Sequence, residues 1–81
     1  MSNFYGLGVS IDRRWALVFV DVPGVAHVSF YVGDACTGTE WFRGPEREAE
    51  AVSCARACNV LDENITICDA DGTRRRPATR R

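Results

Sequence analysis

The sequence has no lysine, a single histidine and no long apolar run. All ten basic residues are arginine, which we attribute to genome composition because this usage has no folding rationale. The longest apolar candidate, residues 15–22, already contains Asp21, whereas a membrane span needs about 18 apolar residues. Residues 1–3 lack the basic and apolar regions of a secretory signal. These absences predict a cytoplasmic protein with no membrane partner.

The chain of 81 residues is short enough for one domain and apolar enough to fold, with 46% hydrophobic and 26% charged residues. Its charge is uneven. Residues 1–73 carry five arginines against eleven acidic residues, a net charge of −6, and residues 74–81 carry five arginines and no acid. We therefore expect a single acidic domain over 1–73 and a basic, disordered tail over 74–81.

The first half of the chain is typical of β-structure. Residues 3–11 alternate loosely, and residues 15–22 and 25–32 are rich in β-branched and aromatic side chains. Pro23-Gly24 between them has the chemistry of a type II turn, because glycine takes a positive φ at little cost. We expect a loop over Gly33–Thr39 and a short strand over Glu40–Arg43.

A two-residue loop fixes an expected register for this hairpin, in which Val22 faces Val25 and each further pair steps outward by one residue. One side then gathers the bulky residues and is expected to be the core: Trp15, Leu17, Phe19, Val28, Phe30 and Val32. The other side is mixed rather than charged: Ala16, Val18, Val20, His27, Ser29 and Tyr31. A solvated face would alternate to charge, so we expect this second side to contact a partner. The alternative is that the N-terminal strand or the Gly33–Thr39 loop folds back and covers it.

The second half begins with a helix signal. Gly44-Pro45 precedes acidic residues that suit the positive end of a helix dipole, and apolar residues then recur at helical spacing (Ala51, Cys54, Ala55, Cys58 and Leu61). The helix is expected to end between Asn59 and Leu61. Ile65–Cys68 reads as a closing strand before an Asp69–Gly72 turn. The whole predicts an α+β fold, an antiparallel sheet of three to five strands with one helix on one face, in βββ(β)αβ order.

The Trp15 strand, the alanine-spaced helix and the closing segment ITICDADGTRRR resemble small bacterial and phage domains of unknown function. The resemblance covers roughly residues 15 to 76. In size, acidity and layout the chain also resembles phage-encoded inhibitors of bacterial defence complexes, the anti-CRISPR-like proteins. That resemblance implies a small protein that acts by binding a larger host complex.

The residues that could carry chemistry do not form a recognisable constellation. The Cys54–Cys58 spacing is too wide for a disulfide, and the four cysteines lack the paired spacing of a zinc site, so we expect buried free thiols, with metal binding or a long-range disulfide as alternatives. His27 has Ser29 on its face but no acid to orient it. We expect no catalytic residue, no cofactor and no metal.

The arginines of the tail have two interpretations. Arg74, Arg75, Arg76, Arg80 and Arg81 can contact nucleic-acid phosphates, or they can simply keep a solvated end soluble. No aromatic residue interleaves with them in the sequence, so there is no stacking platform. Because the body is acidic, we expect any contact with nucleic acid to be made only through the tail.

These observations together predict a non-enzymatic protein-binding module. Its sharpest form is a phage or mobile-element inhibitor that blocks a nucleic-acid-binding surface of a larger host complex, using its acidity to compete for a basic groove. The expected contact residues are Val18, Val20, His27, Ser29 and Tyr31, toward a foreign protein or a second copy of the chain. The alternatives are a nucleic-acid-associated accessory protein that uses the arginine tail, and a small zinc-stabilised module.

Overall fold

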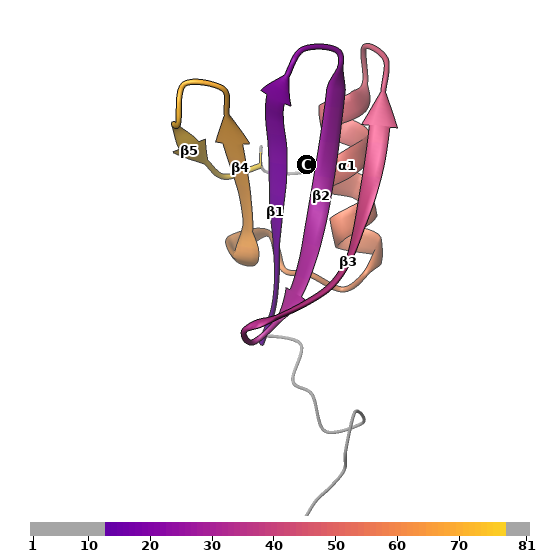
Figure 1. The fold of residues 1–81 in the computed structure, drawn as a ribbon. Helices are drawn as coiled ribbons and strands as arrows, with labels where there is room; N and C mark the ends of the chain where they lie inside the picture. Colours follow the sequence, from indigo (N-terminus) through magenta and orange to yellow (C-terminus); the bar gives the residue numbers. More distant parts are fainter. Residues whose placement is uncertain (1–12, 78–81) are drawn as a thin grey trace, which may run out of the picture.

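The computed structural model describes residues 13–77, which form one five-stranded sheet with one helix packed on one side (Figure 1). The sheet order is β3-β2-β1-β4-β5. The elements in chain order are β1 (Arg14–Val22), β2 (Val25–Val32), β3 (Ala35–Arg43), α1 (Arg47–Ala57), a 3₁₀ turn (Asp62–Asn64), β4 (Ile65–Asp69) and β5 (Arg74–Arg75). The α+β class and the helix on one face are confirmed.

The sheet is mixed, and the expectation of a wholly antiparallel sheet was wrong. β4 pairs with β1 in parallel, while β1–β2, β2–β3 and β4–β5 are antiparallel. The physical reason is the connection through α1. A chain that leaves β3, crosses the sheet as a helix and returns as a strand has room to run parallel, which a tight turn does not allow.

The hairpin turn is where the sequence places it, but the register beyond it differs by one residue. Gly24 has φ 81°, as the third position of a type II turn requires, and Val22 pairs with Val25. The next pair is Phe19 with His27, so β1 holds one extra residue between the two pairs. Type II turns match the twist of paired strands poorly, and a bulge adds local twist.

This one-residue slip reverses the faces predicted for β1. Val18 and Val20 lie on the side of α1, and Val18 pairs with Val28. Phe19 and its neighbours at every second position lie on the side away from the helix. Because side chains alternate along a strand, one extra residue exchanges the buried and exposed sets completely.

The core is built from small side chains beneath α1. Ala16, Val18, Ala26 and Val28 from the sheet are fully buried, and further buried residues come from the helix, the following loop and β4: Ala51, Val52, Ala55, Val60, Ile65 and Ile67. The alanines let the helix lie close to the strands. Such close contact leaves no space for aromatic rings at these positions.

The helix ends by a Schellman motif. Asn59 takes a left-handed φ of 67°, its N–H donates to the Arg56 carbonyl, and the Val60 N–H donates to the Ala55 carbonyl. Val60 is buried against the core, so the motif also fixes where the chain leaves the helix. The helix therefore stops at Ala57, two residues before the predicted region.

Two further boundaries differ from expectation. The segment predicted as a Gly33–Thr39 loop is mostly strand, because β3 begins at Ala35 and pairs along the whole of β2. The tail does not begin at residue 74, because Arg74 and Arg75 form β5 against β4. The strand predicted over residues 3–11 and the end of the tail, residues 78–81, lie outside the described residues.

Candidate functional site

The side of the sheet opposite α1 is covered by no helix of residues 13–77 (Figure 1). We call it the open face. Its strand positions follow from the pairing register, in which cross-strand partners share a face. They are Trp15, Leu17, Phe19, Val22, Val25, His27, Ser29, Tyr31, Cys36, Thr39, Trp41, Arg43, Thr66, Cys68 and Arg74.

Aromatic rings stack across the strands of the open face. The centroids of Trp15 and Tyr31 lie 4.1 Å apart with an interplanar angle of 12°. His27 lies between two further rings, 4.7 Å from Phe19 and 4.4 Å from Trp41. These separations are close to the strand spacing of about 4.8 Å. The rings therefore stand upright, each against its neighbour, and direct their edges outward.

One continuous cross-strand row joins all five strands. Phe19 pairs with His27 and with Cys68, His27 pairs with Trp41, and Cys68 pairs with Arg74. The order across the sheet is Trp41, His27, Phe19, Cys68 and Arg74. At the β3 edge Trp41 is 60% exposed, because β3 is the outermost strand of the sheet that residues 13–77 form. At the β5 edge the row ends in a guanidinium.

Polar contacts hold the open face in this arrangement. The Trp15 indole N–H donates to the Gly33 carbonyl at 2.7 Å, which orients the ring against Tyr31. The hydroxyls of Ser29 and Thr39 share a hydrogen bond at 3.3 Å. Ser29 is buried among larger neighbours although it is polar. The face is thus an ordered surface rather than a loose apolar patch.

The charge on the open face is of one sign. Arg43 pairs with Val25, Arg74 pairs with Cys68, and Arg76 donates to the Thr66 hydroxyl at 3.0 Å. All three arginines are exposed. None of the strand positions on this face holds an aspartate or glutamate. Glu40 and Asp69 occupy strand positions on the helix side, and Asp21 lies in the β1 bulge, where no register partner assigns it to a face.

The predicted contact residues divide between the two faces. His27, Ser29 and Tyr31 lie on the open face as expected, whereas Val18 is fully buried and Val20 packs against the core under α1. The expectation that those two valines face a partner was wrong because of the β1 bulge. The sequence analysis missed the aromatic residues Trp15, Phe19 and Trp41 as surface residues. For Trp15 and Phe19 the signal was the unbroken apolar run over residues 15–20 of β1, which marks a strand with two contact faces.

The arginines predicted as a tail also divide. Arg74 and Arg76 lie on the open face, and Arg75 points to the other side. Arg80 and Arg81 lie outside the described residues. β5 therefore brings arginine next to the aromatic rows, a proximity that spacing along the sequence does not reveal.

Arg75 joins β5 to the helix layer. Its guanidinium donates two hydrogen bonds at 2.9 Å to Glu48 of α1 and two at 2.8 and 2.9 Å to Asp69 of β4. These contacts hold the pKa of Glu48 and of Asp69 below their usual values, chiefly through the Arg75 hydrogen bonds, and raise the pKa of Arg75. Both carboxylates are thus ionised, and both accept hydrogen bonds from Arg75. Neither is available as a general acid near neutral pH.

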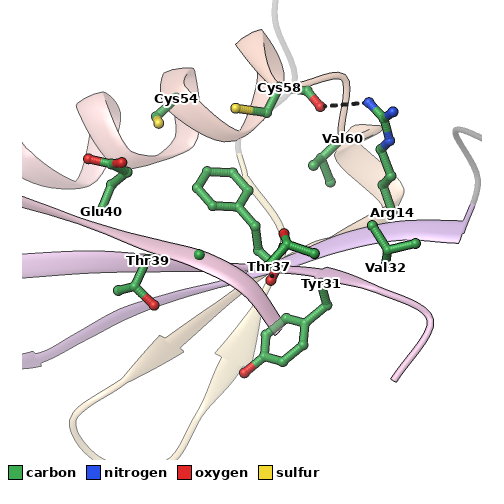
Figure 2. A pocket seen from close by; sticks show the side chains of 11 residues that line it. Arg14, Tyr31, Val32, Thr37, Thr39, Glu40, Cys54, Cys58 and Val60 are labelled. Carbon is green, nitrogen blue, oxygen red and sulfur yellow. Dashed lines mark hydrogen bonds between the residues drawn. The ribbon is translucent and has the colours of Figure 1, made fainter. Parts of the chain in front are cut away.

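A groove of about 510 Å³ lies on the other side of the sheet, between α1 and the β2–β3 pair (Figure 2). Figure 2 shows Cys54 and Cys58 on the groove side of α1, and the Arg14 guanidinium donating to the Cys58 carbonyl at 3.3 Å. Burial raises the pKa of the Cys54 thiol, followed by the effect of Cys58 nearby. Cys54 is therefore a poor nucleophile at neutral pH.

The four cysteines are free and are not gathered at one place. Cys54 and Cys58 share a helix face, Cys36 is exposed near the start of β3, and Cys68 is buried in β4. Within residues 13–77, no three His, Cys, Asp or Glu side chains are grouped closely enough to hold a metal ion. The zinc alternative thus has no ligand set in this part of the chain.

Comparisons of the chain with protein-family models, with curated proteins and with solved structures found no match. No helix in the described part of the chain is long and apolar enough to cross a membrane. The function is therefore argued from the geometry of the open face.

Proposed function

We propose that this protein is a non-enzymatic binding module that engages a macromolecular partner through the open face. The observation that carries the proposal is the aromatic row that stays uncovered by any helix of residues 13–77. Exposed large apolar patches mark interaction sites on soluble domains. Aromatic residues and arginine are also the side chains most enriched where binding energy concentrates.

The other surfaces support this role less well. The groove beside α1 places its two thiols on an apolar wall, and the ion pairs of Arg75 are saturated within the domain. The open face, by contrast, combines ring edges with exposed guanidinium groups. It offers both apolar contact area and charge-assisted hydrogen bonds to one partner.

A second candidate is supported by the helix layer. Glu46, Glu50 and Glu63 are exposed on the side of the molecule that carries α1. An acidic layer of this kind can compete with nucleic acid for a basic groove, as in the phage or mobile-element inhibitors that the chain resembles in size and acidity. In that form of the proposal the helix layer, not the open face, contacts the host complex.

Site-specific photo-cross-linking separates the two candidates. A photoreactive phenylalanine analogue replaces Trp41 on the open face in one variant and the exposed Ala49 of α1 in the other. Irradiation of the producing cells should give adducts from position 41 that disappear when Phe19→Glu is added. Adducts from position 49 alone would assign binding to the helix layer, and equal adducts from both positions would contradict a defined contact face.

A further inference from the structure

We infer that the partner of the open face is single-stranded nucleic acid, an inference that rests on the proposed function and names its partner class. Two properties of this face point to that chemistry together. Its aromatic rings suit stacking with bases, and its charged strand positions are all arginine, which binds phosphate. The proximity of the rings to Arg74 cannot be seen in the sequence, because β5 lies far from β1–β3 along the chain.

The charge of the face argues against a second copy of this chain as the occupant. A symmetric dimer brings the same patch of both copies together. Arg43, Arg74 and Arg76 of both copies would then enter one interface, and the strand positions of the face provide no carboxylate to neutralise them. A polyanion, by contrast, supplies the negative charges that neutralise these three arginines.

The ends of the cross-strand row supply stacking surfaces. Trp41 has His27 on one side of its ring, and its outer side faces away from the sheet at the β3 edge. At the other end of the row Phe19 and Arg74 flank Cys68, whose side chain is small and buried. Two strand spacings separate Phe19 from Arg74, about 9.6 Å. A planar base in contact on both sides needs about 7–8 Å, so a base stacked on Phe19 meets Arg74 when the flexible arginine side chain leans toward it.

Arginine at position 74 suits this arrangement better than a simple point charge. A guanidinium plane stacks on a base while its N–H groups bind phosphate. A strand of nucleic acid lying across the sheet meets Trp41 and Arg43 at the β3 edge, and Arg74 and Arg76 at the β5 edge. The rings lie between these edges. Along such a strand, the bases can therefore stack on the rings while the phosphates contact the arginines.

The same geometry selects single strands over duplexes. Bases inside a duplex are stacked on one another and cannot reach side chains that stand on a sheet. A duplex therefore contacts the arginines only, without the rings. We expect the single strand to bind at least about fivefold more tightly than a duplex of the same length, because stacking of one base on an aromatic side chain contributes at least this factor.

Fluorescence anisotropy tests the inference with the full chain and a labelled oligodeoxythymidine of about 20 nucleotides, longer than the site size of small single-strand-binding domains. Saturable binding is expected at about 50 mM salt. Three phosphate contacts predict a slope of about −2 for the logarithm of the association constant against the logarithm of salt concentration. The affinity should then fall roughly fifteen-fold between about 50 and 200 mM salt.

Matched variants locate the binding on the open face. Trp41→Ala should weaken binding about tenfold, and Leu61→Ala, which removes an exposed apolar side chain elsewhere, should not. Arg74→Glu should weaken binding at least about tenfold and flatten the salt slope by about 0.7 or more. Arg47→Glu makes the same charge change on α1 and should leave binding within about twofold of the wild type.

Absence of saturable binding at low salt overturns the inference, and so does binding that Trp41→Ala and Arg74→Glu leave unchanged. Nuclease treatment of the adducts at position 41 distinguishes the proposed function, binding through the open face, from the inference that the partner is nucleic acid. Nuclease-sensitive adducts support both statements. Nuclease-resistant adducts support binding of a protein through the open face and contradict the inference that the partner is nucleic acid. A lack of adducts at position 41 rejects the proposed function itself.

Discussion

The two faces of the same sheet differ in the size of their side chains, and in the opposite sense to a usual domain. The most deeply buried strand positions of the helix face are alanine, valine and isoleucine, all at most 1% exposed, and Phe30 and Phe42 pack beside them: Ala16, Val18, Ala26, Val28, Ile65 and Ile67. The open face holds the larger residues, among them both tryptophans. Large aromatic side chains contribute most when buried. Within residues 13–77 the rings on the open face are therefore not buried by α1, and their burial by a partner is the proposal that the following variants test.

The difference also explains how the helix is held. Small residues at the sheet surface and on α1 let the two layers approach closely, so packing rather than helix propensity stabilises α1. Two aromatic rings, Phe30 and Phe42, pack against the edge of this core, whereas Trp15, Phe19, Tyr31 and Trp41 lie on the open face, where their rings stack on one another or on His27. Stability therefore comes mainly from the helix face, and binding is assigned to the open face.

The largest expected effect comes from the same substitution made at two adjacent residues of β1. Val18→Glu places a carboxylate in a fully buried site and should lower the free energy of unfolding by at least about 4 kcal/mol, which unfolds a small domain. Phe19→Glu, on the open face, should cost only about 1 kcal/mol through lost cross-strand contacts. Urea denaturation followed by circular dichroism measures both.

Other outcomes for Val18→Glu and Phe19→Glu would contradict the assignment of one face as core and the other as binding surface. Equal destabilisation by the two variants would mean that both faces are core. A folded Val18→Glu variant with an unfolded Phe19→Glu variant would restore the register predicted from the sequence, without the β1 bulge.

An intermediate effect is expected from the two cysteines of α1. Cys54 packs against the core, so Cys54→Ser should lower the free energy of unfolding by about 1 kcal/mol because a hydroxyl replaces an apolar thiol. Cys58 is exposed, and Cys58→Ser should change it by less than about 0.5 kcal/mol. Thermal unfolding of both variants checks the difference, and a larger loss at Cys58 would show that α1 is rotated relative to this structure.

The smallest expected effect is on the acid dependence of stability. The lowered pKa values of Glu48 and Asp69 mean that their pairing with Arg75 stabilises the fold above about pH 4 and that this stabilisation is lost as pH falls through the folded-state pKa values. Arg75→Ala should therefore lower the melting temperature at neutral pH and make it fall less steeply on acidification.

Arg74→Ala is the matched control, since it alters the same strand on the open face. Its melting temperature should follow that of the wild type across the acidic range. A steep acid dependence retained in Arg75→Ala would show that other carboxylates, not this ion-pair cluster, govern acid unfolding.

The sequence predicts the elements better than it predicts their faces. The Pro23-Gly24 turn, the helix after Pro45 and the strand at Ile65 follow from local chemistry, and each is present. The face of Val18 and Val20 does not follow, because a single extra residue near the turn exchanges the two sides of a strand. No local residue preference marks that bulge.

Two other features needed long-range information. The small residues of Ala35–Thr39 resemble a loop in isolation and become a strand only by pairing with β2. The parallel placement of β4 and the pairing of Arg74 with Cys68 depend on the path of α1 across the sheet. The candidate site therefore could not be assembled from the sequence, although most of its residues lie in strands that the sequence predicts.

Intrinsic tryptophan fluorescence during titration with unlabelled oligodeoxythymidine tests the central claim most directly, because the only two tryptophans, Trp15 and Trp41, both lie on the open face. We predict saturable quenching that weakens as salt is raised and that shifts to higher oligonucleotide concentration in Arg74→Glu but not in Arg47→Glu. Fluorescence that stays constant while the oligonucleotide binds, or quenching that Arg74→Glu leaves unchanged, would contradict the assignment of the open face as the binding surface.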